Sequence, residues 1–319
     1  MITKRKTTIG LVFGGKSGEH EVSMRSAKSI RDNLNKNKYK VIDIFIDKKG
    51  YFEVEKFRLC DVIFPIVHGT YGEDGCLQGM LELMDVAYVG AGVLGSAVGM
   101  DKDVQKRLLM QAGIKVAKYK VIKEKCFDYA QDLTYPVFVK PANMGSSVGV
   151  SKAHKTQELH KALKTAFLYD TKVIIEEAVK GREIEVAVLD GVASVPGEVI
   201  PKGKHEFYDY EAKYMDESGA ELRIPAEITN DQNSMIKKIA EKVFQVLECE
   251  GMARIDMFLT SDGEIIVNEI NTLPGFTDIS MYPILWQKSG LKYSDLLDRL
   301  IEIAIKKKLK KDKLKRSYG

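Results

Sequence analysis

The chain of 319 residues is long enough for two or three domains, and its 45% hydrophobic residues are the proportion of an ordinary folded protein. The formal net charge of +4 is unevenly spread, because residues 306–319 hold eight Lys or Arg and one Asp, so the remaining chain is slightly acidic. This balance gives no reason to expect a nucleic acid as partner. The basic tail is interpreted as a solvated helix end, with a weak contact to an anionic surface as the alternative.

The four cysteines stand far apart, without a CxxC pair or the Cys and His spacing of a zinc site, so reduced thiols are expected. The apolar run after the basic N-terminus, residues 9–13, is too short for the core of a signal peptide. No segment approaches the roughly 18 to 20 apolar residues of a membrane span. We therefore expect a cytoplasmic protein without membrane insertion.

Apolar runs and helical patterns alternate along the first hundred residues. Strands are expected at TIGLVF, YKVIDIFI, DVIFPIVHG and AYVG, and helices over residues 23–34 and 77–84. This alternation is typical of a parallel sheet with helices on its faces. The sequence thus predicts a parallel α/β domain over residues 1–101.

The pattern changes after residue 101, where strands follow one another in close pairs. The helix DKDVQKRLLMQAG precedes YKVI, YPVFVKP, GVSKA and KVIIEEAV, with a further helix over residues 156–169. The last part contains EIEVAVL, ASVPGEVI, a helix over residues 231–247, a β-hairpin and a terminal helix. Two α+β lobes are therefore predicted, over residues 102–181 and 182–319.

A formal P-loop pattern, GxxxxGK[ST], lies between Gly10 and Ser17. In a P-loop the four central residues form a loop after a strand, whereas here they are LVFG and belong to the expected strand. The register argues against a P-loop NTPase, which stays as an alternative of a different class. Glu19, after the following turn, is equally compatible with a ligand contact and with a favourable charge at a helix start.

The segment VFVKPANMGSSVGVSKA combines a lysine at a strand end with a turn rich in glycine and serine. Glycines let a backbone approach phosphate closely, hydroxyl and N–H groups donate to it, and Lys140 adds positive charge. A phosphate-binding loop with Ser146 and Ser147 is therefore favoured over a flexible surface hairpin.

The segment RIDMFLTSDGEIIVNEIN predicts a β-hairpin with a two-residue Asp-Gly turn at residues 262–263. This turn sets Asp256 opposite Glu269 and Arg254 opposite Asn271, all on one face of the sheet. Two carboxylates side by side are destabilising unless a cation joins them. Mg²⁺ prefers such oxygen ligands together with phosphate oxygens, so a magnesium site is predicted. The alternative is a surface network in which Arg254 neutralises both acids.

Three further features have functional interpretations beside plain structural ones. His68 ends the strand DVIFPIVHG, at the carboxyl strand end where α/β sheets bind ligands. The polar stretch GKHEFYDYEAKYMDESG is long for a turn and is interpreted as a lid that includes Lys213 and Tyr214. Glu176 and Glu177 follow the apolar KVII and are candidates for contact with a nucleotide base and ribose.

The motifs GGKSGEHEVS, HGTYGEDG, MDK, VKPANMGSSVGVSK, FYDYEAKY, GMARIDMF and NEINTLPGFT occur in this order. With them the chain resembles the D-alanine:D-alanine ligases of the ATP-grasp superfamily, over residues 7–304. The resemblance implies an N-terminal parallel α/β domain followed by two ATP-grasp lobes that hold ATP between them. A homodimer is expected.

The resemblance also implies which residues bind the nucleotide and its metal ions. Lys102 and Lys140 match lysines that contact ATP phosphates, Ser146 and Ser147 the phosphate loop, Glu176 and Glu183 the positions around adenine and ribose, and Lys213 a lid lysine that reaches phosphate. Asp256, Glu269 and Asn271 match the ligands of two Mg²⁺ or Mn²⁺ ions. A K⁺ ion is a further candidate cofactor.

For the substrates, the resemblance implies a hydrogen-bonded triad of Glu19, Ser146 and Tyr214, in which Glu19 binds the ammonium group of the first D-alanine. His68 lies near the carboxylate of that substrate. The remaining matches are an oxyanion-stabilising pair and a second-substrate subsite: Arg254 with the N–H of Gly275, and Ser280 with Met281.

The implied reaction is the ATP-dependent ligation of two D-alanines through an acyl phosphate, with release of ADP and phosphate, for peptidoglycan precursor synthesis. Related ligases that make D-alanyl-D-serine or D-alanyl-D-lactate are the nearest alternative. Tyr214 and Met281 favour D-alanine, because lactate-using relatives replace the tyrosine or rebuild the lid, and resistance-type relatives have an arginine at the position of Met281.

Overall fold

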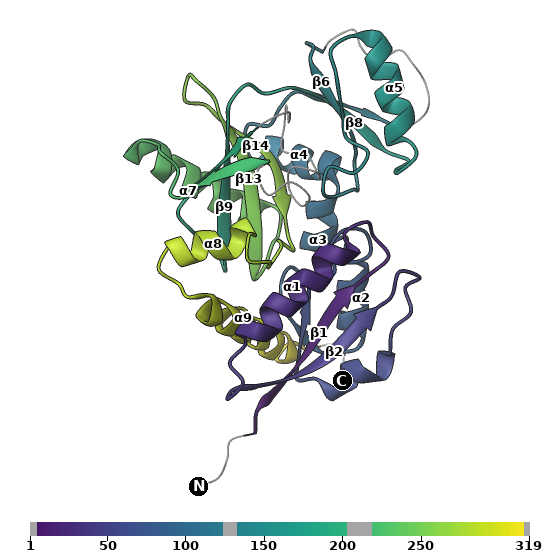
Figure 1. Cartoon of the computed structure of the whole chain (residues 1–319), viewed down its shortest axis with the longest axis vertical. Helices are drawn as coiled ribbons and strands as arrows, with labels where there is room; N and C mark the ends of the chain where they lie inside the picture. Colours follow the sequence, from purple (N-terminus) through teal and green to yellow (C-terminus); the bar gives the residue numbers. More distant parts are fainter. Residues whose placement is uncertain (1–4, 124–132, 203–218, 316–319) are drawn as a thin grey trace.

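The computed structural model describes residues 5–123, 133–202 and 219–315. Their strands form three separate sheets (Figure 1). The first sheet is parallel, in the order β2-β1-β3-β4, with β1 (Thr7–Gly14), β2 (Tyr39–Ile46), β3 (Val62–Pro65) and β4 (Ala87–Tyr88). It confirms the parallel α/β architecture expected for the N-terminal part of the chain.

Helices cover both faces of the first sheet. One face packs against α1 (His20–Asn33) and α9 (Tyr293–Asp312), the other against α2 (Cys76–Leu83) and the 3₁₀ helix η1 (Val54–Leu59). Leu11 of β1 points into the first of these layers, and its neighbour Val12 points into the second. Because β1 is buried on both sides, it is a continuous apolar run rather than an alternating one.

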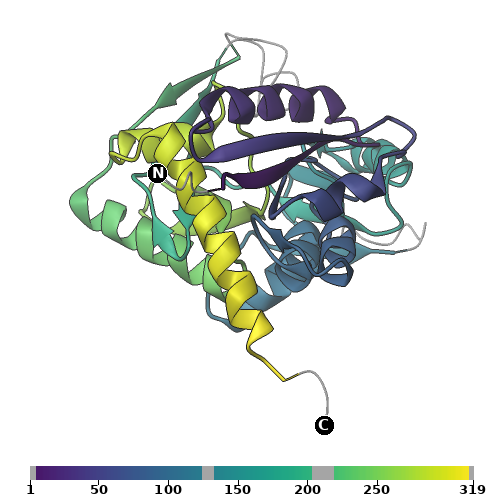
Figure 2. The same cartoon turned by 90° about the horizontal axis from the view of Figure 1, so that it is seen from below.

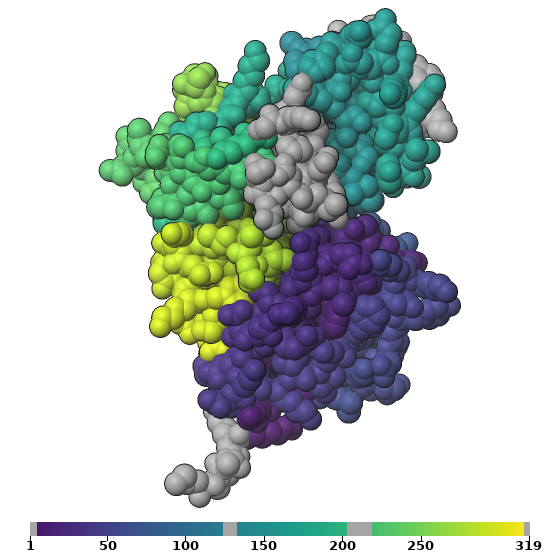
Figure 3. Space-filling view, in the orientation of Figure 1, coloured from purple at the N-terminus to yellow at the C-terminus, as the bar shows by residue number. Residues whose placement is uncertain are grey.

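The second and third sheets are antiparallel, as expected for two ATP-grasp lobes. The second has the order β5-β8-β6-β7, with β5 (Tyr119–Ile122), β6 (Val137–Pro141), β7 (Ser151–Ala153) and β8 (Val173–Glu177). The third has the order β12-β11-β9-β13-β14 with β10 paired to β9, the bounds being β9 (Arg182–Leu189), β10 (Val192–Ala193), β11 (Gly197–Pro201), β12 (Ala220–Arg223), β13 (Met252–Leu259) and β14 (Ile265–Asn271). α5 (Thr156–Ala166) packs on the second sheet and α7 (Asn230–Val246) on the third. In Figure 3 the two lobes (teal and green) lie side by side above the first domain (purple).

Among the described residues, two short α-helices were not predicted, α3 (Val93–Met100) and α8 (Met281–Lys288), and neither was the 3₁₀ helix η1. Glycine is a poor helix former, which hides α3 within VLGSAVGM. Its glycines instead permit close packing: a Cβ at Gly95 would lie 2.5 Å from the carbonyl oxygen of Glu248, and one at Gly99 2.6 Å from Cγ2 of Thr272. α3 therefore packs against the C-terminal lobe (residues 182–319). It leads directly into α4 (Lys102–Gln111), the helix expected after residue 101.

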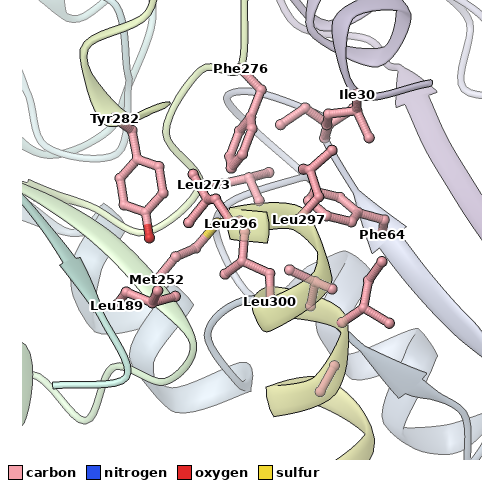
Figure 4. Packing of buried hydrophobic residues seen from close by; sticks show 14 of the residues in the cluster. Ile30, Phe64, Leu189, Met252, Leu273, Phe276, Tyr282, Leu296, Leu297 and Leu300 are labelled. Atoms are coloured by element: carbon pink, nitrogen blue, oxygen red, sulfur yellow. The ribbon is translucent and has the colours of Figure 1, made fainter. Parts of the chain in front are cut away.

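The terminal helix α9 joins the third segment of the chain to the first sheet (Figures 1 and 2). Leu296, Leu297 and Leu300 of α9 are buried in one cluster with Phe64 of β3 and Ile30 of α1 (Figure 4). The proposed domain limits thus separate the strands of the three sheets from one another. The hydrophobic packing, however, continues across these limits. Within the described ranges, no helix is long and apolar enough to cross a lipid bilayer.

Candidate active site

The hairpin of β13 and β14 has the predicted pairs, with Asp256 opposite Glu269 and Arg254 opposite Asn271. The next strand, β9, adds an acid that the sequence prediction missed, because Glu185 lies opposite Asp256. Three carboxylates therefore stand in a row across β9, β13 and β14. The period-two pattern of EIEVAVL could have placed Glu185 on the same face as Glu183, but the order of the strands was needed to bring it to Asp256.

The predicted pairs are right although the predicted turn is wrong. The N–H of Thr260 donates to the carbonyl of Glu264 (3.0 Å), so residues 261–263 form a three-residue loop instead of a two-residue Asp-Gly turn. Beyond the loop, Asn268 is a bulge that opposes no residue of β13. The extra loop residue and the extra residue at the bulge shift the pairing by one residue each in opposite directions, so the shifts cancel. Because of the bulge, the successive residues Asn268 and Glu269 line the same cavity.

Arg254 forms ion pairs with two of the three acids. Its guanidinium lies 2.8 and 2.7 Å from the two oxygens of Asp256 and 3.0 Å from a carboxylate oxygen of Glu185. Asp256 is 2% exposed and Glu185 1% exposed. Arg254 therefore does neutralise Asp256, as the alternative to a metal site had it, but not in a surface network, since this is a buried cluster in which leaving any charge unpaired would be costly.

Two cavities adjoin where the three sheets meet. The small cavity, about 80 Å³, lies between the N-terminal domain and the C-terminal lobe (residues 182–319). The large cavity, about 490 Å³, lies between the central lobe (residues 102–181) and the C-terminal lobe. Predicted site residues that line the small cavity are Glu19, Lys102, Ser146, Arg254, Glu269, Asn271, Gly275, Ser280 and Met281. Those that line the large cavity are Lys102, Lys140, Ser146, Ser147, Glu176, Glu177, Glu183 and Glu269. Lys213 and Tyr214 fall outside the described residues.

Glu19 is delivered to the small cavity by the turn between β1 and α1. Gly14, with a φ of +94°, ends β1, and a Cβ there would lie 2.1 Å from the carbonyl oxygen of Ile46. Glu19 then precedes α1, is 7% exposed and accepts a hydrogen bond from Oγ of Ser146. The predicted contact between the first domain and the phosphate loop is therefore present, although the third member of the triad, Tyr214, is beyond the described part of the chain.

The predicted phosphate loop is held in an unusual backbone conformation. Ser146 and Ser147 have φ angles of +48° and +57°, which non-glycine residues rarely adopt and which cluster at functional sites. Nζ of Lys102 donates to the carbonyl of Met144 (2.7 Å) and lies 3.5 Å from a carboxylate oxygen of Glu269. Lys102 thus links the loop to the row of three carboxylates, Glu185, Asp256 and Glu269, hereafter called the acidic row.

His68 lies behind the small cavity rather than in its wall. Its Nδ1 is 3.1 Å from the carbonyl oxygen of Leu273 and 3.5 Å from the carboxylate of Glu73, which does line the cavity. Its Nε2 is 3.3 Å from Oγ of Ser26, which accepts a hydrogen bond from the N–H of Phe276. Burial lowers the pKa of His68, but its contact with Glu73 and the charges of Glu73 and Glu19 outweigh burial and raise it. The histidine therefore fastens the first domain to the loop that contains Gly275; its contact with a substrate stays a prediction.

The loop before α8 packs tightly around Ser280. Its Oγ accepts from the N–H of Thr277 (3.0 Å), and a Cβ at Gly275 would lie only 2.7 Å from that oxygen. A side chain at position 275 would displace this hydroxyl, so glycine is favoured here by close approach rather than by a positive φ. Met281, the first residue of α8, is 5% exposed and presents an apolar wall to the small cavity.

At the other end of the large cavity, Glu176 is clamped by two lysines. Nζ of Lys140 and Nζ of Lys106 each lie 2.6 Å from one of its carboxylate oxygens. Burial alone would raise the pKa of Glu176, but the charges and hydrogen bonds of the two lysines lower it to about 2. The carboxylate of the neighbouring Glu177 accepts instead from the N–H of Thr134 (2.8 Å) and lies 3.5 Å from Nζ of Lys118. Lys106 was missed because a lysine inside an amphipathic helix pattern is normally a solvated residue.

This pKa shift predicts how the stability of the fold depends on pH. The pKa of Glu176 is lowered from an ordinary value of 4.5, so its contribution, on the order of 3 kcal/mol, is complete above about pH 5 and lost as pH falls toward 2. Glu176→Gln lacks this contribution at every pH. The difference in unfolding free energy between parent and variant, measured by urea denaturation, should therefore shrink steadily between about pH 5 and pH 2. A difference that does not change with pH would contradict it.

The P-loop alternative is wrong. β1 runs through Gly14, so the central residues of the pattern are strand and cannot wrap a phosphate. Lys16 is exposed, lies 4.9 Å from the ring centroid of Tyr71 and lines neither cavity.

Lys16→Ala is accordingly expected to leave the KM for ATP within about twofold of the parent value, as for most surface substitutions. Lys140→Ala should raise it by at least about tenfold, since a buried charged hydrogen bond is lost. Steady-state kinetics with varied ATP compare the two variants. The reverse order of effects would move the nucleotide site to the turn after β1.

The oxygen donors proposed for metal ions are present but partly engaged. Both oxygens of Asp256 contact Arg254, and Oδ1 of Asn271 accepts from the N–H of Leu273 (3.1 Å). Across the described part of the chain, no three His, Cys, Asp or Glu side chains already converge as a metal site. The residue types and their common face fit a hard divalent cation that shares its ligands with phosphate oxygens.

Comparison with known proteins identifies the family. The model of the D-ala D-ala ligase C-terminus matches residues 108–302, and that of the N-terminus matches residues 8–59 and 53–91. The chain is 47% identical to the D-alanine–D-alanine ligase of Oceanobacillus iheyensis, over 98% of this chain and 99% of the relative. It also resembles two solved structures. One is the D-alanine–D-alanine ligase of Bacillus anthracis complexed with ATP, at TM-score 0.82 and 30% identity, covering 96% of this chain and 99% of that one. The other is the VanG D-Ala:D-Ser ligase of Enterococcus faecalis, at TM-score 0.84 and 35% identity, covering 94% and 100%.

A parallel α/β domain followed by two antiparallel lobes with a cavity between them is an ATP-grasp architecture. The chain belongs to the D-alanine–D-alanine ligase family.

Proposed function

We propose that the two adjoining cavities divide the ligation of two D-alanines between them, with ATP in the large cavity and both amino acids in the small one. The activity itself, ATP-dependent formation of D-alanyl-D-alanine for peptidoglycan precursor synthesis, follows from the family. The observation that supports the division is a shared wall. Of the residues that the structure describes, four line both cavities: Lys102, Gly145, Ser146 and Glu269.

The shared wall suits the first step, transfer of the γ-phosphoryl group to the carboxylate of the first D-alanine. Carboxylate oxygen is a poor leaving group, and the acyl phosphate formed with release of ADP corrects this. Lys102 and Lys140 neutralise phosphate charge, while the N–H groups of Ser146 and Ser147 and the hydroxyl of Ser147 donate to phosphate oxygens. Glu19, across the wall, holds the ammonium group of the first substrate.

The small cavity then serves the second step. The free amine of the second D-alanine attacks the acyl carbonyl, and phosphate leaves after the tetrahedral intermediate. Arg254 and the N–H of Gly275 are the proposed donors to its oxyanion. Ser280 and Met281 bound the second substrate. Because a D-serine ligase is among the similar structures, D-serine is the alternative second substrate to be tested.

Two Mg²⁺ or Mn²⁺ ions are proposed on Asp256, Glu269 and Asn271, where they would offset the charge of the ATP phosphates. This assignment requires that the carboxylate of Asp256 be shared between Arg254 and a metal ion. A K⁺ ion and a homodimer are proposed on the resemblance alone. A cytoplasmic location and the domain limits after residues 101 and 181 are proposed on the sequence patterns described above.

The test is an assay of phosphate release from ATP and Mg²⁺ with D-alanine, and identification of the product by mass spectrometry. Release should require D-alanine and yield D-alanyl-D-alanine. D-serine and D-lactate are then supplied in competition as second substrates. A dominant mixed product would overturn D-alanine as the second substrate, and release without any D-amino acid would overturn the ligase assignment.

A further inference from the structure

Lys106 is a buried lysine to which the proposed reaction gives no role. It lies four residues after Lys102 on α4, so both side chains leave the same face of the helix. Lys102 reaches the two cavities, whereas Lys106, one turn further on, is 1% exposed and lines neither. Lys106 therefore cannot touch a ligand in either cavity and can act only through its neighbours.

Those neighbours are two elements of the wall of the large cavity. Nζ of Lys106 lies 2.6 Å from Oε1 of Glu176 on β8 and 3.2 Å from the backbone carbonyl oxygen of Asn268 on β14. Lys140 reaches the same two residues through other atoms, at 2.6 Å from Oε2 of Glu176 and 3.3 Å from Oδ1 of Asn268. Lys106 thus joins the central lobe (residues 102–181) to the C-terminal lobe (residues 182–319) without lining the cavity between them.

Charge balance indicates that Lys106 is not required for neutrality. Glu176 and Lys140 already form a buried ion pair of one negative and one positive charge. Burying a second ammonium group costs free energy that its attraction to Glu176 and to the charge of Glu269 offsets only in part. An apolar side chain of similar length would fill the space without that cost. What an apolar side chain cannot do is donate hydrogen bonds to both Glu176 and the bulge.

Both acceptors matter for the shape of the large cavity. With one lysine on each oxygen, the carboxylate of Glu176 is fixed against rotation. The carbonyl bond fixes the bulge at Asn268, and the bulge is what directs Asn268 and Glu269 into the same cavity. Loss of Lys106 leaves Glu176 with one partner and frees the bulge at one of its anchor points.

We propose that Lys106 is a positioning residue for the nucleotide: acting through Glu176 and the Asn268 bulge, it fixes the wall of the large cavity against which ATP binds. The inference rests on the proposed assignment of ATP to this cavity. It assigns Lys106 an effect on ATP that is separate from any effect on D-alanine, whose residues line the small cavity.

The experiment uses Lys106→Met, which keeps the side-chain length and removes the donor. The melting temperature should stay within a few degrees of the parent, because Lys140 still compensates Glu176. The KM for ATP should rise by about tenfold or more, the effect of losing a charged hydrogen bond, and the KM for D-alanine should stay within about twofold. Lys106→Arg keeps hydrogen-bond donors at the same depth, so its KM for ATP should lie between those of the parent and of Lys106→Met. Lys115→Met is the matched control, since Lys115 makes an exposed ion pair with Glu264 of the same hairpin.

A double-mutant cycle with Glu176→Gln identifies the route of the effect. If Lys106 acts through Glu176, most of its effect on the KM for ATP disappears in the Glu176→Gln background. An undiminished effect there, equal rises in both KM values, or a Lys106→Met and Lys106→Arg pair that do not fold would each overturn the inference. Failure of the ATP assignment looks different: Glu176→Gln alone would then leave the KM for ATP unchanged.

Discussion

Arg254→Met is expected to lower kcat by about 10²-fold to 10³-fold and to destabilise the fold by about 3 to 5 kcal/mol. The kinetic loss follows from the proposed role of the guanidinium as one of two donors to the oxyanion. The loss of stability follows from the ion pairs, because Asp256 and Glu185 are buried and would face each other across paired strands without their shared cation. Few substitutions in this chain should affect both quantities so strongly.

The two losses are measured separately, by urea denaturation and by steady-state turnover under conditions in which the variant is fully folded. Arg31→Met is the matched control, because Arg31 also contacts a carboxylate, Asp43, but both side chains are substantially exposed. Exposed pairs contribute about 0 to 1 kcal/mol, so this control should change neither stability nor turnover much. A stable Arg254→Met variant with parent turnover would remove Arg254 from the site; an unstable one with parent turnover would leave it a structural role only.

The acidic row explains how far the sequence could lead. Asp256, Glu269 and Asn271 were placed together by the period of a strand and by an expected turn close to them in the chain, both of which are local properties. Glu185 and Lys106 were not, because their partners come from strands and helices about 70 residues away or more, and strand order is not a local property. The bulge at Asn268 was equally hidden, and the predicted pairs were right only because the longer loop compensates for it.

The helices show the same limit of sequence-based prediction, namely that contacts between distant residues are not visible in local patterns. α1 and α7 were found from amphipathic spacing, because each buries one face on its own sheet. α3 was not found, since its glycines serve contacts with Glu248 and Thr272, far along the chain. The terminal helix α9 was predicted as a helix, yet its packing on the first sheet depends on topology. Sequence therefore identifies what each element is more readily than what it touches.

Glu269→Gln is expected to fold with nearly the parent stability and to lose turnover by about 10²-fold or more. Glu269 lies opposite Asp256, so replacing its charge relieves repulsion in the unliganded chain. The replacement also gives up attraction to lysines: a partly exposed pair with Lys102 at 3.5 Å and the charges of Lys106 and Lys140. These two changes largely offset each other. Turnover is affected differently, because the residue lines both cavities at the proposed place of phosphoryl transfer, where a metal ion contributes several kcal/mol of charge stabilisation.

The decisive measurement is turnover as a function of Mg²⁺ concentration, together with the melting temperature without ligands. For Glu269→Gln the Mg²⁺ concentration that gives half-maximal turnover should rise well above the parent value. Glu264→Gln is the matched control, since Glu264 closes the loop of the same hairpin and pairs with Lys115 on the surface. If Glu269 only positions Lys102, turnover falls while the Mg²⁺ dependence stays as in the parent. If the metal-free variant is markedly less stable instead, the acidic row is a structural network, and the ions must be sought elsewhere in the large cavity.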